Sequence, residues 1–131
     1  MPATLDDVVT IALGLPEVTE GERHGTRSWA VNGKVFAWER RYSKADLKRF
    51  GDDTPPREPI LAVRVDDLAE KEAVLAAGTK GVFTIPHFDG YAAVLIELRA
   101  VGKRALKEAI VDGWLSQAPR DLAARFAAET I

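Results

Sequence analysis

The sequence contains no cysteine among its 131 residues. The chain therefore has no disulfide, no thiol nucleophile and no thiolate ligand for a metal such as zinc. An excess of charge of either sign is also lacking, because 18 basic and 20 acidic side chains give a net charge of −2. No global basic field attracts nucleic acid, so binding of that kind must come from a local patch.

Long apolar runs are lacking as well. No stretch approaches the roughly 20 apolar residues that cross a bilayer as a helix. The first residues, MPATLDD, have neither the basic start nor the apolar segment of a secretory signal. We therefore expect a cytoplasmic protein with no membrane partner. The length and the 47% hydrophobic fraction are typical of one domain, here residues 1–131.

Hydrophobic periodicity and turn residues predict the helices and strands. Thr4 and Asp7 form a capping-box pattern at the start of the first helix. Helices are expected over 5–14, 67–77 and 103–117, with a short helix after Pro119, and strands over 26–32, 34–40, 60–65, 82–85 and 91–98. The polar segments 17–25 and 51–59 are expected to be loops, and 43–50 a short helix capped by Ser43.

The connections between the expected strands are mostly short. Without helical crossovers, such strands pair as antiparallel neighbours. The predicted fold class is therefore α+β, with a five-stranded, mostly antiparallel sheet, helices packed on it and the element order α-β-β-β-α-β-β-α-α. The nearly all-apolar strand 91–98 is expected to be the central one, covered on both faces. Trp114 lies on the apolar stripe of the long helix, so we expect it in the core, where its indole N–H needs a partner.

Asn32-Gly33 is a strong signal for a two-residue hairpin turn between the first two expected strands. The alternation of side chains then predicts an aromatic face on this hairpin. That face is either half of the core or a binding platform edged by arginines. Its expected members are Trp29, Val31, Phe36 and Trp38, and the expected cross-strand pairs are Val31 with Lys34, Trp29 with Phe36, and Arg27 with Trp38.

The segment 23–49 is strongly basic. It holds eight arginines and lysines against two acidic residues, a charge of +6 in a chain of −2. Cations interleaved with aromatic rings suit a surface that follows a nucleic-acid backbone and stacks on unpaired bases. Equally, the cations could guard a strand edge against pairing with another chain, with the rings in the core. The candidate phosphate contacts are Arg27, Arg40, Arg41, Lys44, Lys48 and Arg49, and the candidate stacking groups are Trp38 and Tyr42.

His87 and Asp89 lie on the short connection between strands 82–85 and 91–98. A histidine held by a carboxylate can act as a general base or a ligand, in a small-molecule or enzyme-like pocket with the 51–59 loop. The alternative is that Asp89 bonds to its own turn and His87 fills a satisfied position. No metal-ligand spacing, nucleophile elbow or phosphate loop is present, so we expect no metal, no cofactor and no enzyme activity.

Four short motifs in sequence order resemble the MmcQ/YjbR family of small bacterial proteins. They are Leu15-Pro16-Glu17, the stretch Lys34-Val35-Phe36-Ala37 after Asn32-Gly33, the segment 83–91 (FTIPHFDGY), and Trp114 followed by Ala118-Pro119. The resemblance covers nearly the whole chain and implies an α/β fold with an antiparallel sheet. It also implies DNA as a partner, because the family is often described as DNA-binding. A protein-interaction module that uses a sheet edge or the aromatic face is the third possibility.

Overall fold

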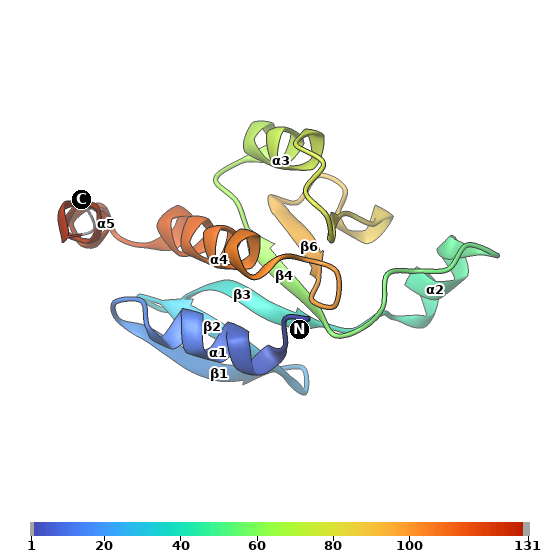
Figure 1. Ribbon diagram of the computed structural model, residues 1–131, viewed down its shortest axis with the longest axis horizontal. Helices are drawn as coiled ribbons and strands as arrows, with labels where there is room; N and C mark the ends of the chain where they lie inside the picture. The colour runs from blue at the N-terminus through green and yellow to red at the C-terminus, as the bar shows by residue number, and fades with distance from the viewer. Residues whose placement is uncertain (1, 130–131) are drawn as a thin grey trace.

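The structure is a computed structural model that describes residues 2–129. Its elements, in chain order, are α1 (Leu5–Leu13), β1 (Val18–Arg23), β2 (Thr26–Val31), β3 (Lys34–Arg40), α2 (Lys44–Phe50), β4 (Ile60–Arg64), α3 (Leu68–Ala76), β5 (Val82–Phe83), the 3-10 helix η1 (Pro86–Phe88), β6 (Ala93–Glu97), α4 (Lys103–Gln117) and α5 (Arg120–Glu129) (Figure 1). Most of the expected elements are therefore present. No helix among residues 2–129 has the length and apolar character needed to cross a membrane.

The strands form one antiparallel sheet in the order β1-β2-β3-β4-β6-β5. This confirms the α+β class and the antiparallel pairing, but the sheet has six strands and not five. The extra strand is β1, in the segment 17–25 that we expected to be a loop. It is an edge strand with five of its six residues exposed, so its sequence VTEGER lacks the apolar alternation that marks a strand.

The position of β6 in the sheet also differs from the prediction. The strand is buried from Ala93 to Ile96, as its apolar sequence indicates. It lies second from the edge, however, beside the two-residue strand β5, so it is not the central strand. Its second face is covered by the 86–91 segment, since Phe88 packs in a cluster with Ala93 and Leu95.

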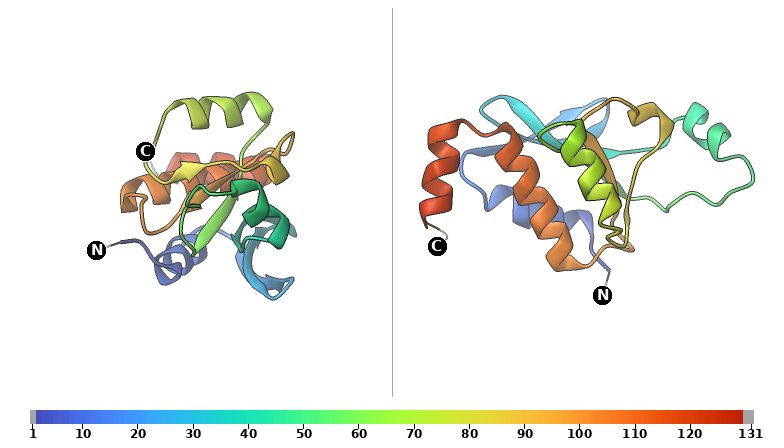
Figure 2. Two further views of the ribbon diagram at one scale, coloured as in Figure 1. Left: turned by 90° about the vertical axis from the view of Figure 1, so that its right-hand side faces the viewer. Right: turned by 90° about the horizontal axis from the view of Figure 1, so that it is seen from above.

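Helices α1 and α4 cover one face of the sheet (Figures 1 and 2). The main core lies between them and the strands, and it includes Trp29, Phe36 and Trp114, none of which has any exposed surface. The indole N–H of Trp114 donates to the backbone carbonyl of Pro16 at 3.1 Å, which supplies the partner that its burial requires. We call this the covered face.

A β-bulge changes the register of the β2–β3 hairpin. The pair Val31–Lys34 is present as predicted, but the register shifts between Trp29 and Ala30. Trp29 then lies opposite Ala37 and not Phe36, and Trp38 lies opposite Ser28 and not Arg27. Because one extra residue reverses the faces of all that follow, Trp38 leaves the predicted aromatic face and lies on the opposite side of the sheet, beside Ala62 of β4.

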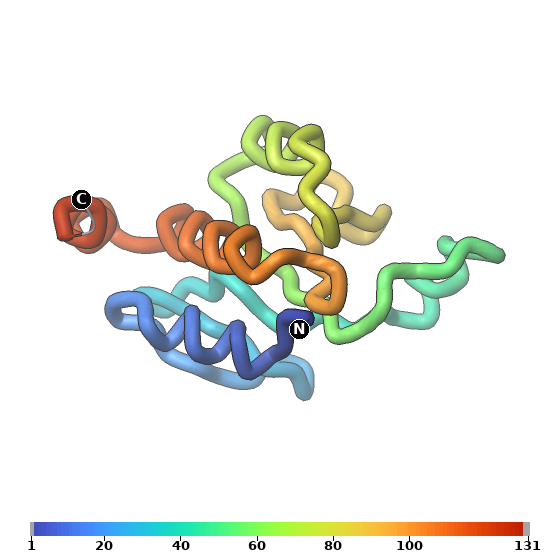
Figure 3. The backbone as a smooth tube through the Cα atoms, in the orientation of Figure 1, coloured from blue at the N-terminus to red at the C-terminus, as the bar shows by residue number. Residues whose placement is uncertain are grey.

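The segment 41–59 extends from the sheet at the end of the molecule opposite α5 (Figures 1 and 3). It contains α2, whose start has the predicted capping box: the Ser43 hydroxyl accepts from the Asp46 amide, and the Asp46 carboxylate accepts from the Ser43 amide at 2.9 Å. Residues 51–59 have no helix or strand, as expected. The extension places the cations of α2 at one end of the sheet.

Candidate functional site

The second face of the sheet carries a smaller cluster of apolar side chains. Trp38, Ala62 and Leu95 come from three adjacent strands, and Phe88 of η1 packs on them. We call this the open face. Two hollows adjoin it. The arginine hollow is lined by Arg23, His24, Gly25, Thr26, Trp38, Glu39, Arg40 and Arg41, and the aromatic hollow by Trp38, Arg40, His87, Phe88 and Tyr91.

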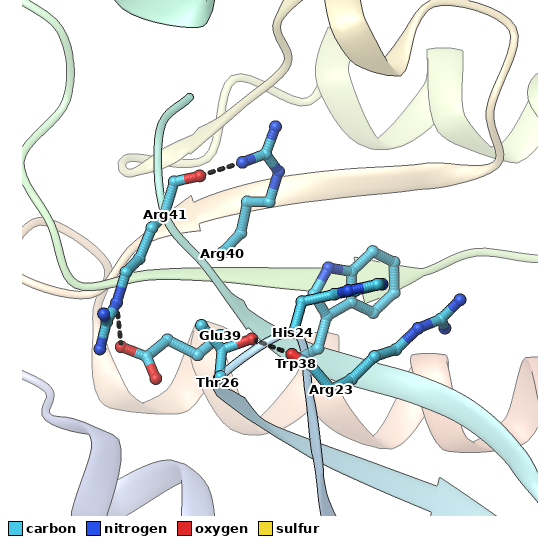
Figure 4. Close-up of a pocket in the computed structure, with 8 residues that line it drawn as sticks. Arg23, His24, Thr26, Trp38, Glu39, Arg40 and Arg41 are labelled. Atoms are coloured by element: carbon cyan, nitrogen blue, oxygen red, sulfur yellow. Dashed lines mark hydrogen bonds and ion pairs between the residues drawn. The ribbon is translucent and has the colours of Figure 1, made fainter. Parts of the chain in front are cut away.

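The arginine hollow is formed where the β1–β2 turn meets the end of β3 (Figure 4). His24 and Gly25 make that turn with positive φ angles of 54° and 79°, and Arg23 and His24 line the hollow together with Trp38, Glu39 and Arg40 of β3. In Figure 4 the side chains of Arg23, His24 and Trp38 extend in the same general direction, whereas Arg41 points away from them toward Glu39. The hollow therefore combines several cationic or protonatable groups with one indole ring.

The aromatic hollow is formed by rings from two segments far apart in the sequence. The Trp38 ring lies 6.3 Å from the ring of Phe88, with 21° between their planes, and 6.2 Å from the ring of Tyr91. Phe88 is 3% exposed and Tyr91 is 40% exposed, so the first is buried beneath the hollow and the second is open to solvent. Because Trp38 and Arg40 line both hollows, the two form one continuous surface.

Arg40 is fixed between β3 and α2 by a buried ion pair. Its Nη2 atom lies 2.8 Å from Oδ2 of Asp46, whose side chain is only 1% exposed. Burial raises the pKa of the Asp46 carboxyl, but hydrogen bonds from Ser43 and the nearby Arg40 guanidinium outweigh it, so the net shift of the pKa is downward. Arg40 is therefore a structural group of the site as well as a cation of both hollows.

Tyr42 is held at the start of the 41–59 extension. Its hydroxyl donates to the carbonyl of Pro56 at 2.7 Å, and its ring lies edge-on to that of Phe50. Burial and the neighbouring acidic residues Glu97, Glu58 and Asp46 raise the pKa of Tyr42 to about 12. The ring thus joins the loop to α2 and does not line either hollow, which separates it from Trp38, the other predicted stacking group.

Lys71 of α3 holds the aromatic segment 86–91 in place. It is the buried residue of that helix, and its Nζ atom donates to the carbonyls of Phe88 at 2.5 Å and Tyr91 at 2.8 Å. Burial lowers the pKa of Lys71, and the charge of Asp89 opposes this shift. The two carbonyls on either side of the Asp89–Gly90 turn are thereby fixed, and with them the backbone that carries the exposed Tyr91 ring.

The structure separates the predicted phosphate contacts into three groups. Arg40 and Arg41 line the arginine hollow, where the Arg41 side chain is 65% exposed and lies 3.7 Å from Glu39. Arg27 lies outside the hollow and pairs with Glu20 of β1 at 3.0 Å. The remaining members of the predicted set are exposed on α2, next to the Arg40–Asp46 pair: Lys44, Lys48 and Arg49.

His87 and Asp89 are not brought together as a pair by the contacts of the described residues. His87 is exposed and lines the aromatic hollow, whereas Asp89 is not among its lining residues and acts electrostatically on Lys71. The 51–59 loop does not line this hollow either. No group of three or more acidic or histidine side chains within residues 2–129 is placed to hold a metal ion.

Sequence reasoning missed Arg23, His24 and Tyr91 as site residues. The first two join the site only because β1 pairs with β2, and β1 was expected to be a loop. Tyr91 was placed inside a long strand, whereas β6 begins at Ala93 and leaves Tyr91 in the segment before it. The signal available in the sequence was the His24-Gly25 dipeptide, which is a two-residue hairpin connection like Asn32-Gly33 eight residues later.

Comparison with known proteins gives a family and a fold. A family model described as YjbR matches residues 13–116. The chain is 44% identical over 131 residues to an uncharacterized protein, Rv2570, of Mycobacterium tuberculosis strain H37Rv and to its counterpart Mb2600 of Mycobacterium bovis, with 98% of each chain covered. The crystal structure of Deinococcus radiodurans protein DR2400, which has a DUF419 domain, superposes with a TM-score of 0.59 at 19% identity, over 86% of this chain and 77% of that one.

Proposed function

The chain belongs to the YjbR family, and from that premise we propose that it acts as a DNA-binding protein and not as an enzyme. The observation that carries the proposal is the arginine hollow. Arg23, His24 and Arg40 line it together with the Trp38 indole, and Arg41, which also lines it, is turned toward Glu39. A guanidinium group offers a planar set of donors that matches the geometry of a phosphate.

The distribution of charge around the hollow supports the same function. The segment 23–49 has a charge of +6 although the whole chain has a charge of −2. The exposed cations of α2 lie beyond Arg40. The ion pair between Arg40 and Asp46 joins Arg40 to that helix. A phosphate backbone that enters the hollow can therefore continue along α2, and each neutralised phosphate releases counterions to the solvent.

A variant that removes cations from the hollow without disturbing buried groups tests this proposal. Arg23→Gln combined with Arg41→Gln removes two charges from exposed side chains. Arg40 is left unchanged because its loss would leave the buried Asp46 carboxylate unpaired. The matched control is Arg104→Gln with Arg125→Gln, which removes two charges from exposed side chains of α4 and α5, outside both hollows.

Binding is measured by fluorescence anisotropy with labelled duplex and single-stranded DNA at several salt concentrations. The native chain and the control should bind with affinities that fall steeply as salt rises. The hollow variant should bind more weakly. The slope of the logarithm of its binding constant against the logarithm of salt concentration should be smaller in magnitude by about 1 for each arginine lost. Equal affinities for the two double variants, or no binding by the native chain at low salt, would contradict the proposal.

A further inference from the structure

We infer that the aromatic hollow receives an unpaired base of single-stranded DNA while the adjoining arginine hollow holds its phosphates. The inference rests on the proposed DNA binding and adds the form of DNA that the site prefers. It predicts a preference for unpaired strands over duplex. The first support is that the two hollows share Trp38 and Arg40, so a ring and an anion on one ligand can occupy both together.

Two rings of the aromatic hollow, those of Trp38 and Tyr91, are partly exposed to solvent. Tyr91 is one of the few large apolar side chains exposed to solvent, at 40%, and it lies 5.7 Å from the buried ring of Phe88. Trp38 is half-buried and stacks on Phe88 from the sheet side. A base that packs against these rings removes apolar surface from water, and it does so for every base because each has a π-face.

The positions of the rings are fixed before a ligand arrives. Lys71 holds the backbone carbonyls of Phe88 and Tyr91, and the Arg64 guanidinium lies 5.1 Å from the Tyr91 ring centre. Arg40 lies 5.7 Å from the Phe88 ring centre and is itself fixed by Asp46. A preformed site loses little conformational freedom when it binds, which raises affinity without added contacts.

The geometry favours unpaired bases over duplex DNA. In a duplex the faces of each base are covered by its neighbours in the stack, so an aromatic side chain can reach a base face only where the strand is unpaired or the base is extruded. The phosphates of a duplex remain accessible to the arginine hollow. Duplex DNA should therefore gain only the contacts of the arginine hollow, and a single strand should gain the contacts of both.

A strand without bases separates the two contributions. The probes are a short labelled oligothymidylate and an abasic strand of the same length, which keeps the phosphates and lacks the rings. The native chain should bind the oligothymidylate at least about fivefold more tightly, the lower end of what one stacked base supplies. The ratio of the two affinities is the readout. A variant that is partly unfolded has a lower apparent affinity for both probes by the same factor, so the ratio is unchanged.

Variants assign the ratio to the two hollows. Tyr91→Leu removes an exposed ring and keeps the backbone carbonyl that Lys71 binds, so it should lower the ratio and leave abasic binding unchanged. Trp38→Leu should lower the ratio further. Arg23→Gln with Arg41→Gln should lower the affinity for both probes by the same factor. Leu115→Ala, at a similarly exposed apolar residue on α4, is the control and should change neither affinity.

Three outcomes would overturn the inference, and they can be told apart. Equal affinity of the native chain for both probes would exclude base stacking while the proposed DNA binding stands. A ratio unchanged in Tyr91→Leu and Trp38→Leu would place the base elsewhere on the molecule. If the native chain binds neither probe nor duplex DNA at low salt, the proposed function fails and the inference fails with it.

Discussion

Trp29 and Trp38 lie on neighbouring strands of one hairpin, yet their surroundings differ as much as any two in the molecule. Trp29 is fully buried on the covered face, beneath the helices α1 and α4. Trp38 is half-buried on the open face and lines both hollows. The covered face thus encloses its tryptophan in the core, whereas the open face leaves part of its tryptophan exposed at two hollows.

The two faces are also held together by different interactions. The covered face is closed by apolar packing, with side chains such as Ile110 and Trp114 completely buried. The open face depends on two buried charged groups, Lys71 and Asp46, that bind backbone and side-chain partners around the hollows. Buried polar groups of this kind contribute little net stability but cost much when one partner is lost. Mutations should therefore affect the two faces through different mechanisms.

The largest effect is expected from the tryptophan of the covered face. Trp29→Ala removes a fully buried ring and leaves a cavity, and we expect it to lower the free energy of unfolding by about 3–5 kcal/mol. Trp38→Ala removes a ring that already contacts solvent, so its cost should be about 1–2 kcal/mol. Urea denaturation followed by circular dichroism measures both values. Equal losses would show that the open face is as important for stability as the covered face.

The second effect tests the ion pair at the edge of the open face. Arg40→Ala leaves the buried Asp46 carboxylate without its cation, and we expect a loss of about 3 kcal/mol in the free energy of unfolding. Arg41→Ala is the matched control, because Arg41 is 65% exposed and pairs with Glu39 only at 3.7 Å. Arg41→Ala should change the free energy of unfolding by less than about 0.5 kcal/mol. Similar losses for the two variants would contradict a structural role for Arg40.

The dependence of stability on pH gives an independent measure of the same pair. The folded-state pKa of Asp46 lies below its ordinary value of 3.8. The carboxylate therefore contributes stability that is present above the unfolded-state pKa and is lost as the pH falls through the folded-state value. In Asp46→Asn, the decline of stability below about pH 4 should be shallower than in the native chain. A decline of equal steepness would show that other carboxylates determine the acid limit.

The sequence could predict most of the fold but not which hairpin residues line the two hollows. Turn residues and periodicity located both strands around Asn32-Gly33, and the Val31–Lys34 pair was correct. The bulge at Phe36 left no signal, because both Phe36 and Ala37 are apolar and either could face the core. That single extra residue decides whether Trp38 is buried or lines a hollow. The alternation of apolar and polar residues cannot reveal this bulge, because the bulge depends on packing against β4 and α4.

The candidate site was predictable only in part, for a related reason. The basic character of the segment 23–49 can be read directly from the sequence, and three of its arginines, Arg23, Arg40 and Arg41, do line the arginine hollow. Their ion pairs are tertiary contacts, so the sequence could not show that Arg27 and Arg40 are already bound to acidic partners. The role of Lys71 could not be predicted, because a lysine in a helix is usually exposed. In this structure Lys71 is buried and anchors its helix.

The smallest effect concerns the close contact that seals the covered face. A Cβ atom at Gly113 of α4 would lie 2.6 Å from Cγ1 of Val63 and 3.3 Å from the carbonyl oxygens of Phe36 and Arg64. Gly113→Ala gains about 1 kcal/mol of helix propensity, but overpacking costs about 1–3 kcal/mol, so we expect a net loss of about 1 kcal/mol.

A double mutant separates this steric effect from other causes. Val63→Ala removes the methyl group that the new Cβ would meet, so the loss in the double variant should be smaller than the sum of the two single losses by about 1 kcal/mol. Additive losses would mean that α4 moves away from β3 and β4 and does not press on Val63. If Gly113→Ala instead raises the free energy of unfolding, the covered face tolerates an added methyl group. The packing at this contact would then not be tight, and the contrast with the open face would fail there.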